Sequence, residues 1–294
     1  MKTGIPLSFR TNIQDLATAL DSVAAHIAAK LECFNSDERT LTDELCDMLS
    51  IALWHLSTQN QKYRIPHPYL SSIPSTQFQI DLAKTTAPEE DRIGADFELA
   101  VSTPSGFKHA LFQAKAIDSV TSDFRNRSRA TMRFMAKQLR KMRQAARNTS
   151  FLLAYIPASH LDGANQGFTT WEQQLYQNRN QNISIHSSRN GASTIGVNVL
   201  LVGNNQLLSK KKFTYSSHNL FTPSSQPLTI TVLGLIACTF GIYSNPDQQG
   251  SVVIPKQKLS LSFSDVEKKE WDSIITKLRN YLLSLDKSNT KLNG

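Results

Sequence analysis

The segment 92–117 contains a turn, and polar and apolar residues alternate on both sides of it. This is the period-2 pattern of half-buried strands. The turn contains Pro104, which fixes φ, and Gly106, which permits a positive φ. Each strand therefore presents one polar and one apolar face. The polar set is Asp96, Glu98, Gln113 and Lys115, and the apolar set is Phe97, Leu99, Val101, Phe112, Ala114 and Ala116. If the two strands pair antiparallel, the polar groups converge on one small patch.

Apolar residues at helical spacing predict four long helices, at residues 12–32, 37–56, 128–147 and 264–285. We expect Asn12 and Ser36 to cap the first two. A capping box of Ser264 and Glu267 opens the last helix. Its inward face is predicted to include Val266, Trp271, Ile274, Ile275, Leu278 and Leu282.

The remaining segments predict shorter elements. Strands are predicted at residues 77–82, 150–156, 183–187 and 195–202, with a short helix at 170–179 and a basic loop at 210–212. The apolar run 229–241 fits a strand or a helix equally well. Residues 84–93 are expected to be a loop, with Glu89 or Glu90 either solvated or taking part in metal binding.

A carboxylate on the second predicted helix is a further candidate for chemistry. Glu38 falls close to the middle of the apolar stripe of that helix, whereas Glu44 lies about 100° away from it. Burying a lone carboxylate is costly, and a metal or a cation would offset the cost. The alternative is that Glu38 simply favours the helix dipole in the first turn. Glu38 is the first candidate for an inward-facing acid, with Glu44 second.

The predicted helix at residues 128–147 is strongly basic. Nine Lys or Arg residues and no acidic residue lie between Arg125 and Arg147. Its outer face is predicted to carry Arg133, Lys137, Arg140 and Lys141. Such a face binds phosphate backbones without reading sequence, or is simply solvated.

The whole chain has 294 residues, a formal net charge of +8 and a pI near 9.4, which fits a polyanionic partner. Its three cysteines are isolated and are interpreted as buried thiols in a reducing compartment. No stretch is apolar for long enough to span a membrane, and no signal-peptide core is evident at the N-terminus. We therefore expect a cytoplasmic protein without a membrane partner.

The sequence G-A-D, sixteen residues and then Q-A-K resembles the core of the PD-(D/E)XK phosphodiesterase superfamily in its Q-x-K variant. The resemblance covers residues 36–157 and implies an α/β fold with a restriction-endonuclease-like αβββαβ core, a mixed central sheet flanked by helices. A scaffold helix at 1–35 precedes this core. An α+β extension at 158–294 follows and is either separate from the core or continuous with it.

The resemblance also implies roles for individual residues. Asp96, Gln113, Glu38 and Glu98 would bind Mg²⁺ or Mn²⁺, and Lys115 would position or activate the hydrolytic water. The implied activity is that of a metal-dependent endonuclease of the kind found in bacterial antiviral defence, with DNA favoured over RNA as the substrate. A homo-oligomer or a regulatory protein partner fits that setting. Because Gln113 replaces the commoner acid, the alternative is a catalytically inactive nucleic-acid-binding or assembly subunit on the same fold.

Overall fold

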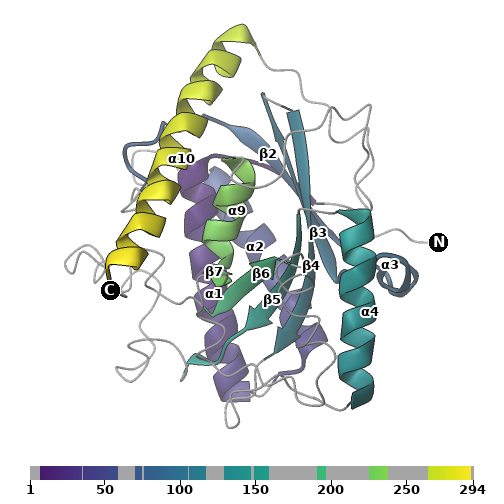
Figure 1. Ribbon diagram of the computed structural model, residues 1–294. Helices are drawn as coiled ribbons and strands as arrows, with labels where there is room; N and C mark the ends of the chain where they lie inside the picture. Colours follow the sequence, from purple (N-terminus) through teal and green to yellow (C-terminus); the bar gives the residue numbers. More distant parts are fainter. Residues whose placement is uncertain are drawn as a thin grey trace.

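The computed structural model describes residues 7–34, 36–58, 70–74, 76–104, 106–116, 129–146, 149–158, 191–196, 225–237 and 264–292. Within these ranges the chain is an α/β protein built on one mixed sheet with helices on both faces (Figure 1). The sheet has seven strands in the order in which they occur along the chain. They are β1 (Leu7–Thr11), β2 (Phe78–Lys84), β3 (Phe97–Thr103), β4 (Gly106–Ala116), β5 (Ser150–Tyr155), β6 (Ala192–Gly196) and β7 (Ser225–Pro227).

All neighbouring strands are antiparallel except β4 and β5, which run parallel. A parallel neighbour requires a crossover connection, and α4 (Arg129–Ala145) lies between these two strands in the chain. The predicted antiparallel hairpin and the predicted buried parallel strand are therefore both confirmed.

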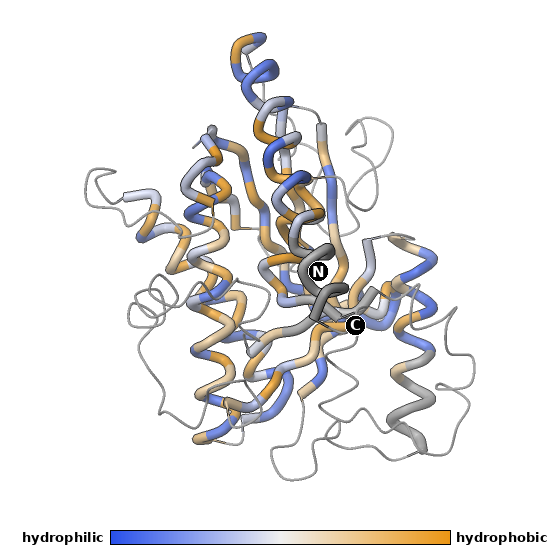
Figure 2. Tube along the Cα trace, turned by 60° about the vertical axis from the view of Figure 1, so that its left-hand side comes forward, coloured by the Kyte–Doolittle hydropathy of each residue, from blue (hydrophilic) through white to orange (hydrophobic). Residues whose placement is uncertain are grey.

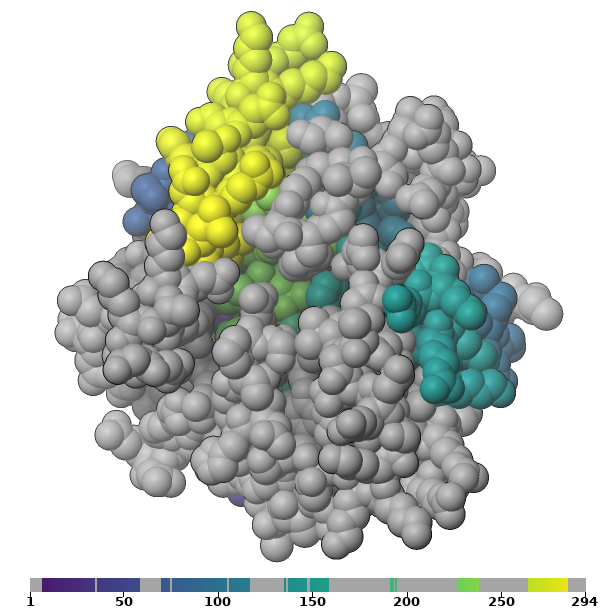
Figure 3. All heavy atoms as spheres, in the orientation of Figure 1, coloured from purple at the N-terminus to yellow at the C-terminus, as the bar shows by residue number. Residues whose placement is uncertain are grey.

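The helices form two layers. In Figure 1, α3 (Ala87–Ile93) and α4 lie on one side of the sheet, and the other helices lie on the opposite side. The opposite layer consists of α1 (Ile13–Phe34), α2 (Glu38–Thr58), α9 (Leu228–Ile236) and α10 (Asp265–Leu292). Figure 3 shows α4 and α10 at well-separated places on the surface of this view.

The main hydrophobic core lies between the sheet and the larger helical layer. It contains the predicted apolar faces of β3 and β4, including Phe97, Leu99 and Phe112, together with Trp271 of α10. Figure 2 shows that apolar residues recur along the strands and along the helices beside them. The polar residues Asp96, Gln113 and Lys115 consequently lie on the opposite face of the sheet, as the alternation predicted.

Residues 87–93 form a helix, so the prediction of a loop there was wrong. Thr86 caps α3, and its amide and hydroxyl both donate to Oε2 of Glu89 at 2.8 Å, completing a capping box. Gly94 ends the helix with φ of 80°. A Cβ at Gly94 would lie 2.3 Å from the backbone oxygen of Gln138 on α4, so the close approach of α3 to α4 depends on glycine.

Several other local predictions also need correction. Asp37, rather than Ser36, caps α2, because Oδ1 of Asp37 accepts from the amide of Thr40 at 3.0 Å. Val266 is 66% exposed and does not face inward. Cys33 is exposed, whereas Cys46 is buried as predicted. Strand β1 was not predicted at all.

The apolar run 229–241 is helical as far as Ile236, since α9 covers that part and is buried along its whole length, and residues 238–241 lie outside the described residues. Predictions for residues 170–179, 183–187 and 210–212, and for most of 195–202, lie outside the described residues. In the part of the chain that the structure describes, no helix combines the length and the apolar character needed to cross a lipid bilayer.

Candidate functional site

Asp96 and Gln113 lie side by side because of the register of β3 and β4. The amide of Asp96 donates to the carbonyl of Phe112 at 2.8 Å, which extends the ladder by one residue beyond β3. This register brings Asp96 next to Gln113, whose Nε2 donates to Oδ2 of Asp96 at 2.7 Å. The same oxygen accepts from the amide of Ala114 at 2.6 Å. The carboxylate is thus held at the rim of the sheet by β4.

Lys115 and Glu38 form a second pair, which together with Asp96 and Gln113 makes up the cluster of the candidate site. Nζ of Lys115 lies 2.5 Å from Oε1 of Glu38, and the amide of Ala116 donates to Oε2 at 3.2 Å. Glu38 is the first residue of α2, so the start of this helix is tied to the end of β4. The structure therefore brings the four predicted residues Glu38, Asp96, Gln113 and Lys115 together.

Burial raises the pKa of Asp96 to about 7, well above the usual 3.8. The Lys115 ammonium and the hydrogen bond from the Ala114 amide oppose this rise. The carboxylates of Glu90 and Glu38 add to it. Asp96 is consequently short of compensating positive charge, a condition that a bound cation would relieve.

The amide of Gln113 is also incompletely satisfied. Gln113 is 1% exposed, and no group of the described residues donates to its buried Oε1. A buried acceptor without a donor costs about 1–3 kcal/mol. An amide oxygen beside a carboxylate is a suitable ligand for a hard divalent cation, so the donor set around Asp96 fits Mg²⁺ or Mn²⁺.

Two other carboxylates that were considered for the site have different partners. Oε1 of Glu98, which is fully buried, lies 2.6 Å from Nδ1 of His109 on β4. Glu44 lies 2.7 Å from Nε2 of His26 and also contacts Lys30, both on α1. Glu44 therefore links two helices, and Glu38 is the acid of α2 that reaches Lys115.

Glu89 and Glu90 on α3 have different hydrogen-bond partners. Glu89 completes the capping box, whereas Oε1 of Glu90 accepts from Nε2 of Gln138 on α4 at 3.0 Å. Glu90 is also close enough to raise the pKa of Asp96 by its charge. The hydrophobic pattern gave no signal for this proximity, because it depends on the close packing of α3 against α4.

Lys84, at the end of β2, is a neighbour of the site that was not predicted. Burial lowers the pKa of Lys84, the Arg39 charge adds to this, and the Asp96 carboxylate opposes it. Its ammonium forms an ion pair with Asp43 of α2. The sequence pattern predicted a strand only as far as residue 82 and placed Lys84 in a loop, whereas β2 extends to Lys84.

The basic face of α4 is exposed at two of the three predicted positions whose side chains are described, and Lys141 is half-buried. Lys137 and Arg140 are exposed, and Nζ of Lys141 donates to the backbone carbonyl of Asp91. The side chain of Arg133 lies outside the described residues. The apolar residues Met135, Leu139, Met142 and Ala146 of this helix are buried.

Among the residues with described positions, no three His, Cys, Asp or Glu side chains lie together in a way that could hold a metal ion by themselves. A cation here would rest on Asp96, the Gln113 amide oxygen and Glu38, with water completing its coordination. Glu38 would have to exchange its bond to Lys115 for the cation, which would release the lysine amine.

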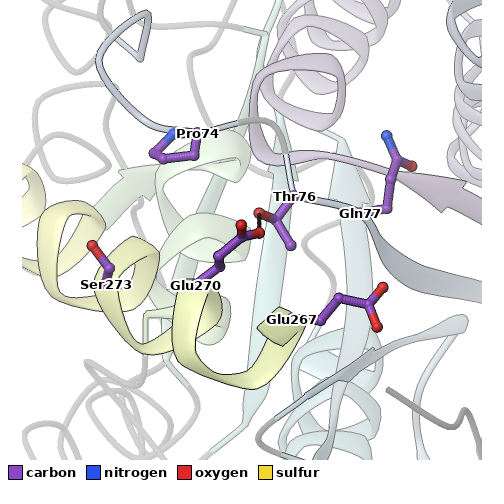
Figure 4. Close-up of a pocket in the computed structure, with 6 residues that line it drawn as sticks. All are labelled: Pro74, Thr76, Gln77, Glu267, Glu270 and Ser273. Atoms are coloured by element: carbon purple, nitrogen blue, oxygen red, sulfur yellow. Dashed lines mark hydrogen bonds between the residues drawn. The ribbon is translucent and has the colours of Figure 1, made fainter. Parts of the chain in front are cut away.

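A separate pocket of about 480 Å³ lies between the segment leading into β2 and the start of α10 (Figure 4). It is lined by Pro74, Thr76, Gln77, Glu267, Glu270 and Ser273. Oγ1 of Thr76 donates to Oε2 of Glu270 at 3.4 Å across it. None of the predicted site residues lines this pocket, so it does not enlarge the cluster around Asp96.

Comparison with known proteins adds no relative: no family model, no curated protein and no solved structure matches the chain.

Proposed function

We propose that this protein is a metal-dependent nuclease that hydrolyses phosphodiester bonds, on a restriction-endonuclease-like core of the PD-(D/E)XK type. The observation that carries the proposal is the convergence of Glu38, Asp96, Gln113 and Lys115 at the rim of β3 and β4. Two carboxylates, an unsatisfied amide oxygen and an ammonium in one patch form a donor set suited to phosphodiester hydrolysis.

The proposed division of labour follows from the contacts. Asp96 and Gln113 would hold a Mg²⁺ or Mn²⁺ ion, with Glu38 as the third oxygen donor. The bound ion would lower the pKa of a water molecule and neutralise charge on the phosphate. Lys115, released from Glu38, would orient that water or stabilise the charge that develops on phosphorus.

The order of elements supports the same proposal. Helix α2 is followed by β2, β3 and β4, then by α4 and the parallel strand β5, with α3 as an insertion before β3. This order corresponds to the αβββαβ core that the sequence motif implies. Strands β6 and β7 continue the same sheet beyond that core.

The substrate is proposed to be nucleic acid, with DNA favoured over RNA. Lys137 and Arg140 lie exposed on α4, the helix that follows the Q-x-K strand, where they can contact phosphates without reading bases. We place the activity in the cytoplasm, in antiviral defence with a regulatory partner or a second copy of the chain, on the resemblance alone.

One observation favours a second candidate, a nucleic-acid-binding subunit without catalytic activity. Lys115 is neutralised by Glu38, and Gln113 donates its amide to Asp96, so the polar groups largely satisfy one another. In such a subunit, the cluster would serve only to hold α2 against β4.

Cleavage assays separate the two candidates. Purified full-length protein would be incubated with plasmid DNA and with RNA, in Mg²⁺ or Mn²⁺ and then in EDTA. The Asp96→Ala and Lys115→Ala variants would be compared with the matched control Asp91→Ala, an exposed acid on α3. We expect metal-dependent cleavage that both site variants lose and the control retains.

Loss of a catalytic group of this kind typically lowers the rate by about 100-fold or more. Binding without cleavage in every metal would reject the nuclease proposal in favour of the binding subunit. Cleavage that survives in both Asp96→Ala and Lys115→Ala would place the activity elsewhere in the chain.

A further inference from the structure

Two buried glutamines near Asp96 share one hydrogen-bonding pattern. Gln113 on β4 is 1% exposed and Gln138 on α4 is 3% exposed. Nε2 of Gln113 donates to Asp96 at 2.7 Å, and Nε2 of Gln138 donates to Glu90 at 3.0 Å. In both cases Oε1 is buried, and none of the described groups donates to it.

In each pair the amide nitrogen, and not the amide oxygen, faces the carboxylate. An amide turned by 180° exchanges its nitrogen and oxygen with little change in shape. In the turned state, the amide oxygen would face the carboxylate, which is unfavourable unless a cation lies between them. Both glutamines can therefore change from donors into cation ligands; the cation would then satisfy the carboxylate and the amide oxygen, while the amide nitrogen would give up its bond to the carboxylate.

Glu90 lacks a cationic partner of its own. Within the described ranges, no Lys, Arg or His pairs with its side chain, and its hydrogen bond comes from the neutral Gln138. Its carboxylate adds to the electrostatic effects that raise the pKa of Asp96. The carbonyl of Glu90 accepts from the amide of Gly94 at 2.7 Å, so α3 ends two residues before Asp96.

The packing of α3 on α4 keeps this arrangement rigid. The Cα of Gly94 lies against the backbone of Gln138, so the C-terminus of α3 and the middle of α4 are in direct contact. The ammonium of Lys141, one turn along α4, donates to the carbonyl of Asp91. Gln138 is thus held opposite Glu90 by backbone contacts as well as by its own side chain.

We propose that Glu90 and Gln138 form a second binding position for a hard divalent cation, adjoining the position at Asp96 and Gln113. The inference rests on the proposed function, because the two positions share the Asp96 region. Carboxylate and amide oxygens are the donors that Mg²⁺ and Mn²⁺ take, with water for the remainder. A cation there joins α3 to α4 and so fixes the exposed residues Lys137 and Arg140 relative to Asp96.

Binding of Mn²⁺ to the full-length protein tests this inference without any nuclease assay. Isothermal titration calorimetry gives the number and affinity of bound ions, and electron paramagnetic resonance of free Mn²⁺ checks the count. The test variants are Glu90→Gln and Gln138→Met, which remove a charge and an amide oxygen respectively. The matched controls are Asp91→Asn on α3 and Gln144→Met on α4, both at exposed positions.

We expect two Mn²⁺ ions per wild-type chain. Glu90→Gln and Gln138→Met should each weaken one of them by about tenfold or more and leave the other bound. Both controls should keep two ions with wild-type affinity, and Asp96→Asn should weaken both. Circular dichroism at the start of each titration would establish that every variant is folded.

Other outcomes overturn the inference. A single ion that Asp96→Asn removes and Glu90→Gln does not would reject the second position and leave the proposed function standing. Two ions that are both unaffected by Glu90→Gln and Gln138→Met would also reject it. No bound ion in the folded wild-type protein would reject both this inference and the proposed metal-dependent function.

Discussion

Burial of the Asp96 carboxyl makes folding sensitive to pH. The pKa of Asp96 is raised from 3.8 to about 7 in the folded chain, chiefly because burial disfavours the charged form. The folded state therefore binds a proton that the unfolded chain releases near pH 4. Stability from this group is fully present below about pH 4 and is lost as the pH rises through about 7.

Asp96→Asn should remove this loss. Since one pKa unit is worth about 1.4 kcal/mol, the Asp96 contribution falls by on the order of 4 kcal/mol between pH 4 and pH 7 as an upper bound. Urea unfolding at a series of pH values would show the variant gaining stability relative to wild type as the pH increases over this range. The free energy of unfolding of the control Asp91→Asn should depend on pH as that of wild type does. A difference in unfolding free energy between Asp96→Asn and wild type that does not change with pH would contradict the prediction.

The site residues differ in how far the sequence could identify them. The two-residue period of the strands was sufficient to place Asp96, Gln113 and Lys115 on one face. The helical angle ranked Glu38 ahead of Glu44, but it could not identify their partners, because these lie on other elements. The Glu98–His109 contact required the register of β3 and β4, which alternation alone does not give.

At the scale of elements, α3 is a short helix that the hydrophobic pattern did not predict. Its start was visible in the sequence as Thr86 followed by Glu89, a capping-box spacing, and Gly94 marked its end. The segment was nevertheless interpreted as a loop, because seven residues are too few for a clear apolar period. Recognising this helix changes the site, since α3 carries Glu90.

Gly94→Ala should loosen the contact between α3 and α4. Alanine disfavours a φ of 80°, and its Cβ would lie 2.3 Å from the Gln138 backbone oxygen. We expect a loss of about 2 kcal/mol or more in the free energy of unfolding, measured in urea, because strain and overpacking add. Unchanged stability would show that α3 does not pack on α4 in this way.

The exposed cations of α4 make a separate prediction about binding. In the double variant Lys137→Ala/Arg140→Ala, the affinity for duplex DNA should fall, and its dependence on salt should become shallower by about two ions. Fluorescence anisotropy over a range of salt concentrations would give the slope. The control Lys269→Ala/Lys277→Ala removes two exposed charges from α10 and should leave the slope unchanged.

At the scale of the whole molecule, the helix α9 links the central strand β4 to α10. Nζ of the buried Lys108 donates to the carbonyl of Leu235 at 2.8 Å, and the Arg279 guanidinium of α10 donates to the carbonyl of Ala237. Two cations thus satisfy the C-terminus of α9, where the helix dipole favours them. The resulting core includes residues of α1, α2, α9, α10 and the sheet.

Because the core is continuous, a substitution that destabilises α10 should also destabilise the candidate site. Trp271 is fully buried and its ring centroid lies 5.6 Å from that of Phe78 on β2, whereas Trp54 on α2 is 61% exposed. Trp271→Ala should cost about 3–5 kcal/mol, and Trp54→Ala well under 1 kcal/mol. Because the core is shared, Mn²⁺ binding and circular dichroism should report the same lowered urea midpoint for Trp271→Ala.

Two separate midpoints for Trp271→Ala, with Mn²⁺ binding persisting after the loss of α10 structure, would instead show that the C-terminal part folds as an independent unit. The joining of β6 and β7 to β5 argues against that outcome, because these strands complete the sheet on which Asp96 lies. Their backbone bonds connect the C-terminal segment to the strand next to β4. The stability of the candidate site and that of the C-terminal segment should consequently change together.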